Sequence, residues 1–288
     1  MTFGRKRKAS CGEPAWFDMS PGSRIPDRGS RGPGLRFLGT LAVLILAFAC
    51  SSGGAATEPA PVTQPIGPGR SSARVLMLTA TAAFRHDSIP AARQVMTRLA
   101  VTSGQFAVTP TEDLSLITAD TLRGYDVVMF ALTSGELPFS ASQKNALIDF
   151  VSSGHGFVGV HSATDTLYEW PDYGRLVGAY FKEHPWTQRG TVALEDPSHP
   201  ANAGVTDRLS ITEEFYTFQE NPRPHVAVLL HLDPVSVGAA GGDYPLAWAQ
   251  SFGTGRSYYN ALGHFPETWN DDRFQRMLAS AIVWASGR

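Results

Sequence analysis

Residues 156–166 read GFVGVHSATDT and carry the clearest indication of the fold. The first five residues are apolar or glycine, without polar alternation. This pattern is typical of a strand buried on both faces in a parallel sheet that helices cover. The run then changes to His161 and small polar residues. Because ligands bind outside the carboxyl ends of parallel strands, we expect His161 to lie in a functional site.

The regions on either side alternate between strand and helix patterns. Upstream, strands are predicted at residues 75–79, 106–109 and 126–132, with helices at 89–100 and after the capping box of Ser140 and Gln143. Downstream, strands are predicted at 191–194, 226–230, 246–249 and 256–261, and a closing helix at 273–285. The order predicts a flavodoxin-like α/β fold, with a doubly wound, mostly parallel sheet and helices on both faces.

The composition changes near residue 72. The 288 residues are 43% hydrophobic and 17% charged, which suits one sizeable globular domain with non-globular segments. We interpret residues 1–50 as a basic leader and signal peptide, and residues 51–72 as a flexible tether rich in Pro, Gly and Ser. The folded domain is expected at residues 73–288.

The apolar run at residues 35–49 has the length of a signal-peptide core. Ala47 and Ala49 fit an ordinary secretory cleavage site, whereas Cys50 fits a bacterial lipoprotein signal whose cysteine is lipidated. An uncut membrane anchor is a further interpretation, and translation from Met19 is an alternative start. The lipoprotein interpretation predicts an exported protein of the bacterial cell envelope, attached through Cys50 to the outside of the cytoplasmic membrane.

Cysteine and charge exclude several functions. The two cysteines are Cys11 and Cys50, so the domain beyond them has neither a disulfide nor a cysteine nucleophile. Residues 51–288 carry 16 Lys and Arg against 23 Asp and Glu. An acidic domain without a basic stripe argues against nucleic acid as a partner.

All eight histidines lie in the predicted domain. We interpret His155, His199, His225 and His231 as structural or surface residues. The other four follow predicted strands or lie among aromatic and small residues, and they are His86, His161, His184 and His264. Histidine transfers protons near neutral pH and binds metals, but no spacing such as H-E-x-x-H marks a particular metal site.

Six blocks in order resemble the trehalose-utilisation, or ThuA-like, family. They are FRHDSI at 84–89, GVHSATDT at 159–166, Phe181 with HPW at 184–186, EFY at 214–216, PLAW at 245–248 and ALGH at 261–264. The resemblance covers about residues 74–287. It implies a sugar-related role and a fold similar to class I glutamine amidotransferases.

In class I glutamine amidotransferases a cysteine occupies the position of His161, so the resemblance excludes thioester chemistry here. Residues 264–267, HFPE, resemble their later His-Pro-Glu segment with one insertion.

We therefore expect an exported sugar-active hydrolase, lyase or isomerase acting on a disaccharide, glycoside or keto-sugar. The expected catalytic residues are His161, His264, Asp165 and Glu214, and the expected substrate-binding residues are His86, His184, Trp170, Trp186 and Tyr216. Candidate ligands for one divalent metal ion are His86, His161, His184 and His264. The alternatives are a carbohydrate-binding lipoprotein without turnover, and a structural domain of the envelope. The sequence does not predict the oligomeric state.

Overall fold

The strand predicted around residue 158 is β4, Gly156–Val160, and all of its residues are buried. It lies inside a nine-stranded sheet with the order β2-β1-β3-β4-β9-β8-β7-β5-β6. The computed structural model describes residues 72–205 and 208–288. The predictions for the leader, for nearly all of the tether and for Cys50 lie outside these residues. No helix in the described ranges is long and apolar enough to cross a membrane.

One half of the sheet is parallel. It consists of β1 (Ala73–Leu78), β2 (Phe106–Thr111), β3 (Val127–Ala131), β4 and β9 (Gly255–Asn260). Each pairs in parallel with its neighbour in the order β2-β1-β3-β4-β9. With β9 in the fifth position, this is the strand order of flavodoxin-like folds.

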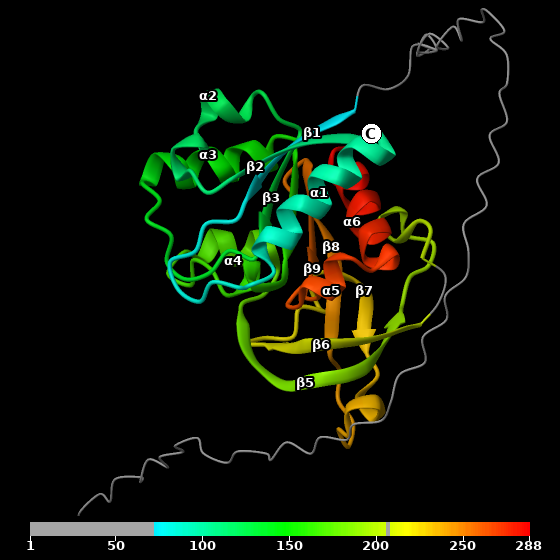
Figure 1. Cartoon of the computed structure of the whole chain (residues 1–288). Coiled ribbons are helices and arrows are strands. Elements are labelled where there is room, and N and C mark those ends of the chain that lie inside the picture. Colours follow the sequence, from blue (N-terminus) through cyan, green and yellow to red (C-terminus); the bar gives the residue numbers. More distant parts are fainter. Residues whose placement is uncertain (1–71, 206–207) are drawn as a thin grey trace, which may run out of the picture. The chain divides into compact units, whose positions relative to one another are not determined.

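Helices pack against this parallel half. Their bounds are α1 Ile89–Ser103, α2 Ala119–Leu122, α3 Ala141–Ser152, α4 Pro171–Val177, α5 Pro266–Trp269 and α6 Asp272–Ala285. Figure 1 shows α3 and α4 on one side of the strands and α1 and α6 on the other. The capping box of Ser140 and Gln143 is present at the start of α3. Short 3-10 turns lie at Leu114–Leu116, His161–Thr164, Pro200–Asn202 and Pro234–Val237.

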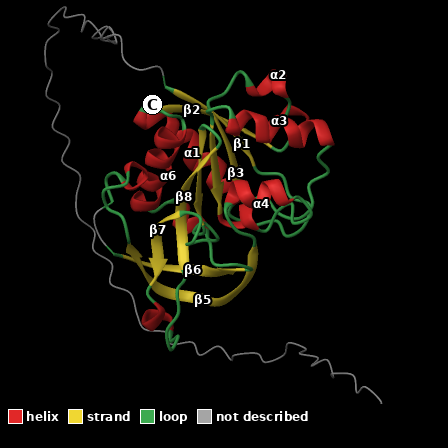
Figure 2. Cartoon of the chain, turned by 180° about the vertical axis from the view of Figure 1, so that it is seen from behind, coloured by secondary structure: helices red, strands yellow, loops and turns green. Residues whose placement is uncertain are grey.

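The other half of the sheet is antiparallel, so the prediction of a doubly wound, mostly parallel sheet is wrong. Its strands are β5 (Phe181–Leu194), β6 (Leu209–Phe218), β7 (Ala227–Leu232) and β8 (Pro245–Phe252). The pairs β9-β8, β8-β7, β7-β5 and β5-β6 are all antiparallel. Figure 2 shows β5 and β6 crossing below the strands of the parallel half.

The short connection between β8 and β9 explains why the sheet becomes antiparallel where β8 joins the parallel half. Phe252 pairs with Gly255, which leaves only Gly253 and Thr254 for the turn. A parallel crossover needs roughly a dozen residues or more, so this hairpin has to be antiparallel. Gly253 has φ +62°, and an added Cβ would lie 2.4 Å from the backbone oxygen of Ser152. The turn therefore requires glycine.

The strand β6 was not predicted, because its inward positions are not all apolar. Leu209, Ile211 and Phe215 are buried on alternate positions, as a strand requires, but Glu213 occupies the buried position between them. The carboxylate interrupts the hydrophobic alternation. For β5 the prediction began ten residues late, because residues 182–189 are mostly polar and mostly exposed. An antiparallel sheet tolerates such a strand, since it can leave one face in water.

Candidate functional site

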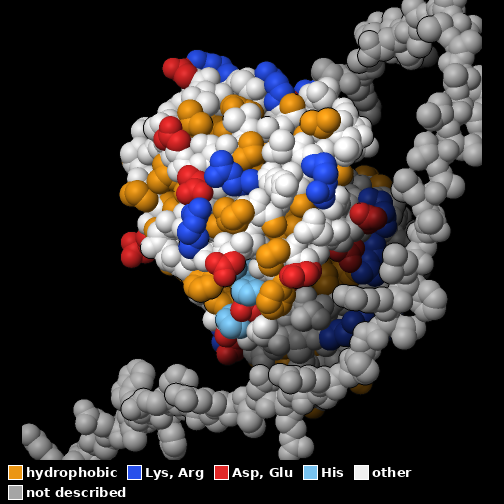
Figure 3. Space-filling model, in the orientation of Figure 1, with side chains coloured by type: hydrophobic (Ala, Val, Ile, Leu, Met, Phe, Trp, Pro, Cys, Tyr) orange, Lys and Arg blue, Asp and Glu red, His pale blue; other side chains and the backbone are white. Residues whose placement is uncertain are grey.

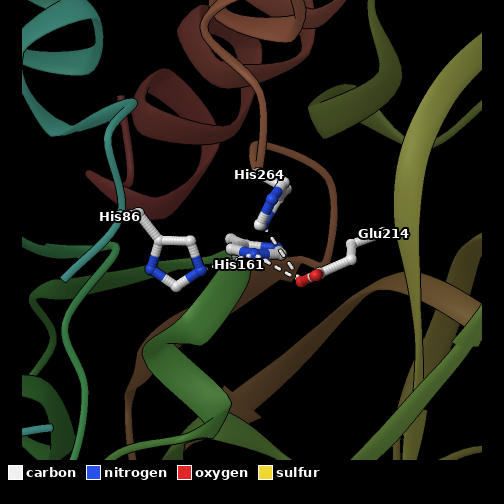
Figure 4. A group of neighbouring side chains, drawn as sticks. All are labelled: His86, His161, Glu214 and His264. Carbon is white, nitrogen blue, oxygen red and sulfur yellow. Dashed lines mark hydrogen bonds and ion pairs between the residues drawn. The ribbon is translucent and has the colours of Figure 1, made fainter. Parts of the chain in front are cut away.

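Four ionisable side chains converge at the junction of the two halves (Figure 4). We call them the His/Glu cluster, which consists of His86, His161, Glu214 and His264, and one ligand atom from each lies within 4.8 Å of the others. His86 follows β1, His161 follows β4 and His264 follows β9, so the parallel half supplies the histidines. Glu214 lies on β6 and is the contribution of the antiparallel half.

His161 lies at the sharp end of β4. Its φ is +53°, a left-handed conformation that costs a residue with a side chain on the order of 1 to 3 kcal/mol. The turn is held by Tyr259, whose hydroxyl donates to the backbone oxygen of His161 at 2.7 Å. Thr164 donates to the same oxygen at 3.3 Å. Non-glycine residues in this conformation are enriched at functional sites, where the surrounding structure maintains the strain.

The hydrogen bonds of His161 determine its tautomer. Nδ1 lies 2.8 Å from the backbone oxygen of Ala261, and a carbonyl only accepts, so Nδ1 carries the proton. In the neutral ring, Nε2 then presents a lone pair to the cluster. Nε2 lies 2.9 Å from the hydroxyl oxygen of Tyr216 and 3.1 Å from Nε2 of His86. Metal-binding histidines commonly have their other nitrogen fixed in this way.

Burial keeps two of the histidines neutral. It lowers the pKa of His86 to about 4, and the positive charge of His264 acts in the same direction. Burial likewise lowers the pKa of His161 well below its usual value, with His86 as the next cause. Neutral imidazole is the form that binds a metal and accepts a proton.

His264 and Glu214, by contrast, have pKa values shifted in favour of their charged forms. Burial alone would lower the pKa of His264, but the carboxylates of Glu214, Glu213 and Asp87 together outweigh it and raise that pKa. Burial alone would raise the pKa of Glu214, but His264 and the other histidines lower it. Nδ1 of His264 is 3.0 Å from Oε2 of Glu214, which is an ion-pair distance. Beyond this ion pair, the buried Nδ1 makes no hydrogen bond in the described part of the chain.

Glu213 holds the loop that carries His264. Its fully buried carboxylate accepts hydrogen bonds of 2.9 Å from the backbone N–H groups of Gly263 and His264 and from the hydroxyl of Thr268. Burial raises the pKa of Glu213 to about 7, even though these donors act against the shift. The sequence prediction did not include Glu213 among the site residues. The available signal was a carboxylate at an inward position of an alternating pattern.

Three other predicted residues lie around the cluster. Tyr216 is buried and donates to His161. His184 is at the rim, with a 46% exposed side chain, and its Nδ1 is 3.5 Å from Oε1 of Glu214. Glu214 therefore takes the place that the sequence prediction gave to His184 among the candidate metal ligands. Asp165 accepts a hydrogen bond of 2.7 Å from Tyr168 and is not one of the four converging groups. Burial raises the pKa of Asp165, although Tyr168 opposes this.

The two predicted tryptophans are not brought to the cluster. Trp170 is buried and stacks on Tyr173, with a centroid distance of 5.8 Å. Trp186 packs edge-on against Tyr244 at 5.0 Å. Among the described residues, the aromatic rings in contact with the clustered histidines are Phe84, Tyr216 and Phe265.

The donor set of the cluster fits one divalent metal ion. Ligand atoms about 2.1 Å from a common ion lie roughly 3.4 Å apart in a tetrahedral site. The observed separations are 3.1 Å between His86 and His161, 3.0 Å between His264 and Glu214, and 3.7 Å between His161 and Glu214. Three imidazoles and one carboxylate suit zinc, manganese or iron. Nδ1 of His264, which has an ion pair but no hydrogen bond among the described residues, is a nitrogen that such an ion would satisfy.

Comparison with known proteins agrees with the family resemblance. Residues 74–285 match the family model for ThuA, trehalose utilisation. A ThuA-like protein from Bacteroides uniformis has a similar structure, with 23% identity, a TM-score of 0.63 and coverage of 77% of this chain and 95% of its own. One from Parabacteroides merdae has 18% identity, a TM-score of 0.62 and coverage of 75% and 90%. The cytoplasmic protein STM3548 of Salmonella typhimurium has 8% identity, a TM-score of 0.52 and coverage of 74% and 98%. At these identities the likeness shows the fold. No curated protein matches the chain.

Proposed function

The chain belongs to the trehalose-utilisation (ThuA) family, and from this premise we propose that it is an enzyme of carbohydrate metabolism whose His/Glu cluster binds one divalent metal ion. The substrate is a disaccharide, a glycoside or a keto-sugar. The sugar link comes from the family description, and the metal-dependent chemistry comes from the site.

The convergence of four ionisable groups from separate segments is the observation that supports this proposal. Bringing ionisable groups together out of water is unfavourable unless they are paired or used. The cluster contains two buried neutral histidines, a strained backbone at His161 and a buried nitrogen without a hydrogen bond. A structural role alone would be served at lower energy by apolar side chains of similar volume.

The residues of the chain have distinct tasks in this proposal. The cluster residues hold the ion, which when bound supplies Lewis acidity to an oxygen of the sugar. Tyr216 keeps its hydroxyl proton, because burial raises its pKa well above the usual value, and it orients Nε2 of His161. His184 is half-exposed beside Glu214, so it can exchange protons between the site and the solvent. Asp165, whose pKa is raised, is the second candidate acid.

A paired measurement of metal content and turnover tests the proposal. The wild type, His161→Ala and His264→Ala would be analysed for bound zinc, manganese and iron, and assayed on trehalose, other disaccharides, glycosides and keto-sugars. We expect about one metal equivalent and turnover in the wild type, and loss of both in each variant. His225→Ala is the matched control, because His225 is exposed. Full activity in the double variant of His161 and His264 would refute the site, and binding without product would favour a carbohydrate-binding protein.

We also propose that the protein is exported to the cell envelope and anchored through a lipidated Cys50. The apolar run at residues 35–49, followed directly by this cysteine, supports the proposal. Mass spectrometry of the mature N-terminus in a bacterial host would test it. A diacylated cysteine at the first position is expected, and an unmodified N-terminus after Ala49 would indicate simple secretion instead.

A further inference from the structure

An exposed aromatic ring lies directly beside the His/Glu cluster. Phe84 is 63% exposed, and its ring centroid is 4.8 Å from that of His86 at an interplanar angle of 83°. Among the described residues, the exposed large hydrophobic side chains are Phe84, Val101 and Val235. Figure 3 shows histidine side chains at the surface next to hydrophobic and acidic ones. The polar site and an apolar contact surface therefore reach the solvent together.

The backbone around Phe84 is held in place. The hydroxyl of Ser134 donates to the backbone oxygen of Phe84 at 2.6 Å, and the N–H of Ala82 donates to the backbone oxygen of Ser134 at 2.8 Å. Gly135 has φ +71°, and an added Cβ there would lie 2.7 Å from the Cβ of Ala83. The loop thus packs closely on Gly135. A ring presented from a fixed backbone loses little conformational entropy when a ligand binds.

The next side chain along the loop strengthens this anchoring. Both terminal nitrogens of Arg85 donate to the carboxylate of Glu112, at 3.1 and 2.8 Å. Such a bidentate pair fixes the direction of the chain on the far side of Phe84. The loop is held before and after the aromatic residue, while the ring itself stays open to solvent.

A pyranose ring is the ligand that matches this arrangement. When its hydroxyls are equatorial, the C–H bonds form an apolar face, and these polarised hydrogens are attracted to the negative face of an aromatic ring. The hydroxyls at the sugar's edge remain free for the polar groups next to Phe84. We propose that Phe84 is the sugar-stacking residue of this site and takes pyranose rings that have an apolar C–H face. This inference rests on the proposed carbohydrate function and adds the class of ring and the residue that recognises it.

Direct binding measurements test the role of Phe84 without requiring turnover. Calorimetry would compare methyl β-glucopyranoside with sorbitol, which carries similar hydroxyls but has no ring face. The proteins would be the metal-loaded wild type, Phe84→Ala, Phe84→Trp and Val101→Ala. Val101 is the matched control, because it is 80% exposed on α1, outside the site. Melting curves would show that all variants are folded.

We expect Phe84→Ala to weaken binding of the glucoside by about three- to tenfold, and Phe84→Trp to preserve it. Val101→Ala should bind as the wild type does, and sorbitol should bind more weakly than the glucoside to the wild type. With a turned-over sugar, Phe84→Ala should raise KM by a similar factor and change kcat less. Equal glucoside binding by wild type and Phe84→Ala, or no glucoside binding by either, would overturn the inference.

The two proposals fail in different ways. Glucoside binding that depends on Phe84 but yields no product from any sugar would remove the enzyme proposal and leave the stacking residue in place. Turnover that is unaffected in Phe84→Ala would leave the enzyme proposal and remove the stacking residue.

Discussion

The parallel and antiparallel halves of the sheet are built from different sequence patterns, and each contributes a different kind of ionisable group to the site. In the parallel half, β3 and β4 are buried along their whole length and end at polar loops. In the antiparallel half, β5 and β6 carry many exposed or half-exposed residues, and β6 has two adjacent carboxylates. The parallel half supplies the imidazoles, and the antiparallel half supplies the carboxylate that pairs with them.

This difference shows that the cluster depends on the junction between the halves. Glu213 links them directly, because it projects from β6 and holds the loop after β9. Glu214, its neighbour, lies close to His161, His184 and His264. Changes on either side of the junction therefore test how far stability and the site depend on each half.

The largest effect is expected in the core of the parallel half. Phe130 on β3 is fully buried and contacts the rings of Phe139, Phe157 and Tyr173. Phe130→Ala should lower the free energy of unfolding by about 3 to 5 kcal/mol, because it leaves a cavity. Denaturant titration would measure this. Phe252→Ala, at the partly buried end of β8, is the control and should lose roughly 1 kcal/mol. Equal losses would show that the two halves depend on packing to the same degree.

The second largest loss of stability is expected at the junction between the halves. Glu213→Ala removes the acceptor of three buried donors, so we expect a loss of about 3 kcal/mol in the free energy of unfolding, together with weaker metal binding. Glu183→Ala on β5 is the matched control, since that side chain is 57% exposed and its loss should change stability by less than about 0.5 kcal/mol. Unchanged metal content in Glu213→Ala would show that the loop holds His264 without help from β6.

The histidines of the parallel half should make the metal-free protein sensitive to acid. The folded pKa of His86 is about 4, below the unfolded value, so the unfolded state binds more protons as the pH falls from about 6.5 towards 4. The contribution of neutral His86 to stability is therefore fully present above about pH 6.5, and roughly 2 to 3 kcal/mol of it is lost by pH 4. Unfolding titrations of chelator-treated protein would measure this. His86→Gln should reduce the slope over that interval, with His161 supplying what remains, and an unchanged slope would contradict the assignment.

The smallest effect concerns the strained turn of His161. Glycine adopts a positive φ without penalty, so His161→Gly should be about 1 kcal/mol more stable than His161→Ala. Both variants should lack bound metal. Thermal melting of the pair measures the difference, and the comparison cancels the loss of the imidazole itself. A less stable glycine variant would mean that the turn carries no strain.

Sequence patterns predicted the parallel half well because its strands are continuous apolar runs with helices between them. The strand before His161, the helix start at Ser140 and the closing helix near residue 273 all agree with the structure. The second half was harder to predict. Glu213 interrupts the apolar alternation of β6, and β5 is polar over most of its length. The short turn at Gly253 leaves no room for a parallel crossover between β8 and β9, and it was the local signal that the prediction did not use.

The candidate site, like the fold, was predicted only in part from the sequence. His86, His161 and His264 were predicted from their positions after strands, and the structure brings them together with Glu214. Trp170 and Trp186 were selected as aromatic residues near strand ends, but Trp170 is buried and Trp186 packs against Tyr244. Phe84 was not selected as an aromatic contact, because side-chain exposure cannot be deduced from a single residue in a loop.

The sequence by itself determined which chemistry is available in this protein. A domain without cysteine beyond residue 50, with histidines after apolar strands, has acid, base and ligand groups but no thiol. Only the tertiary structure decided that Glu214 and not His184 completes the cluster, that Glu213 anchors the loop of His264, and that Phe84 faces solvent beside His86. The physical reason is that strand ends are specified by local hydrophobic patterns. Contacts between β6 and the loops after β1, β4 and β9 join residues far apart in the chain, and they depend on how the two halves of the sheet pair.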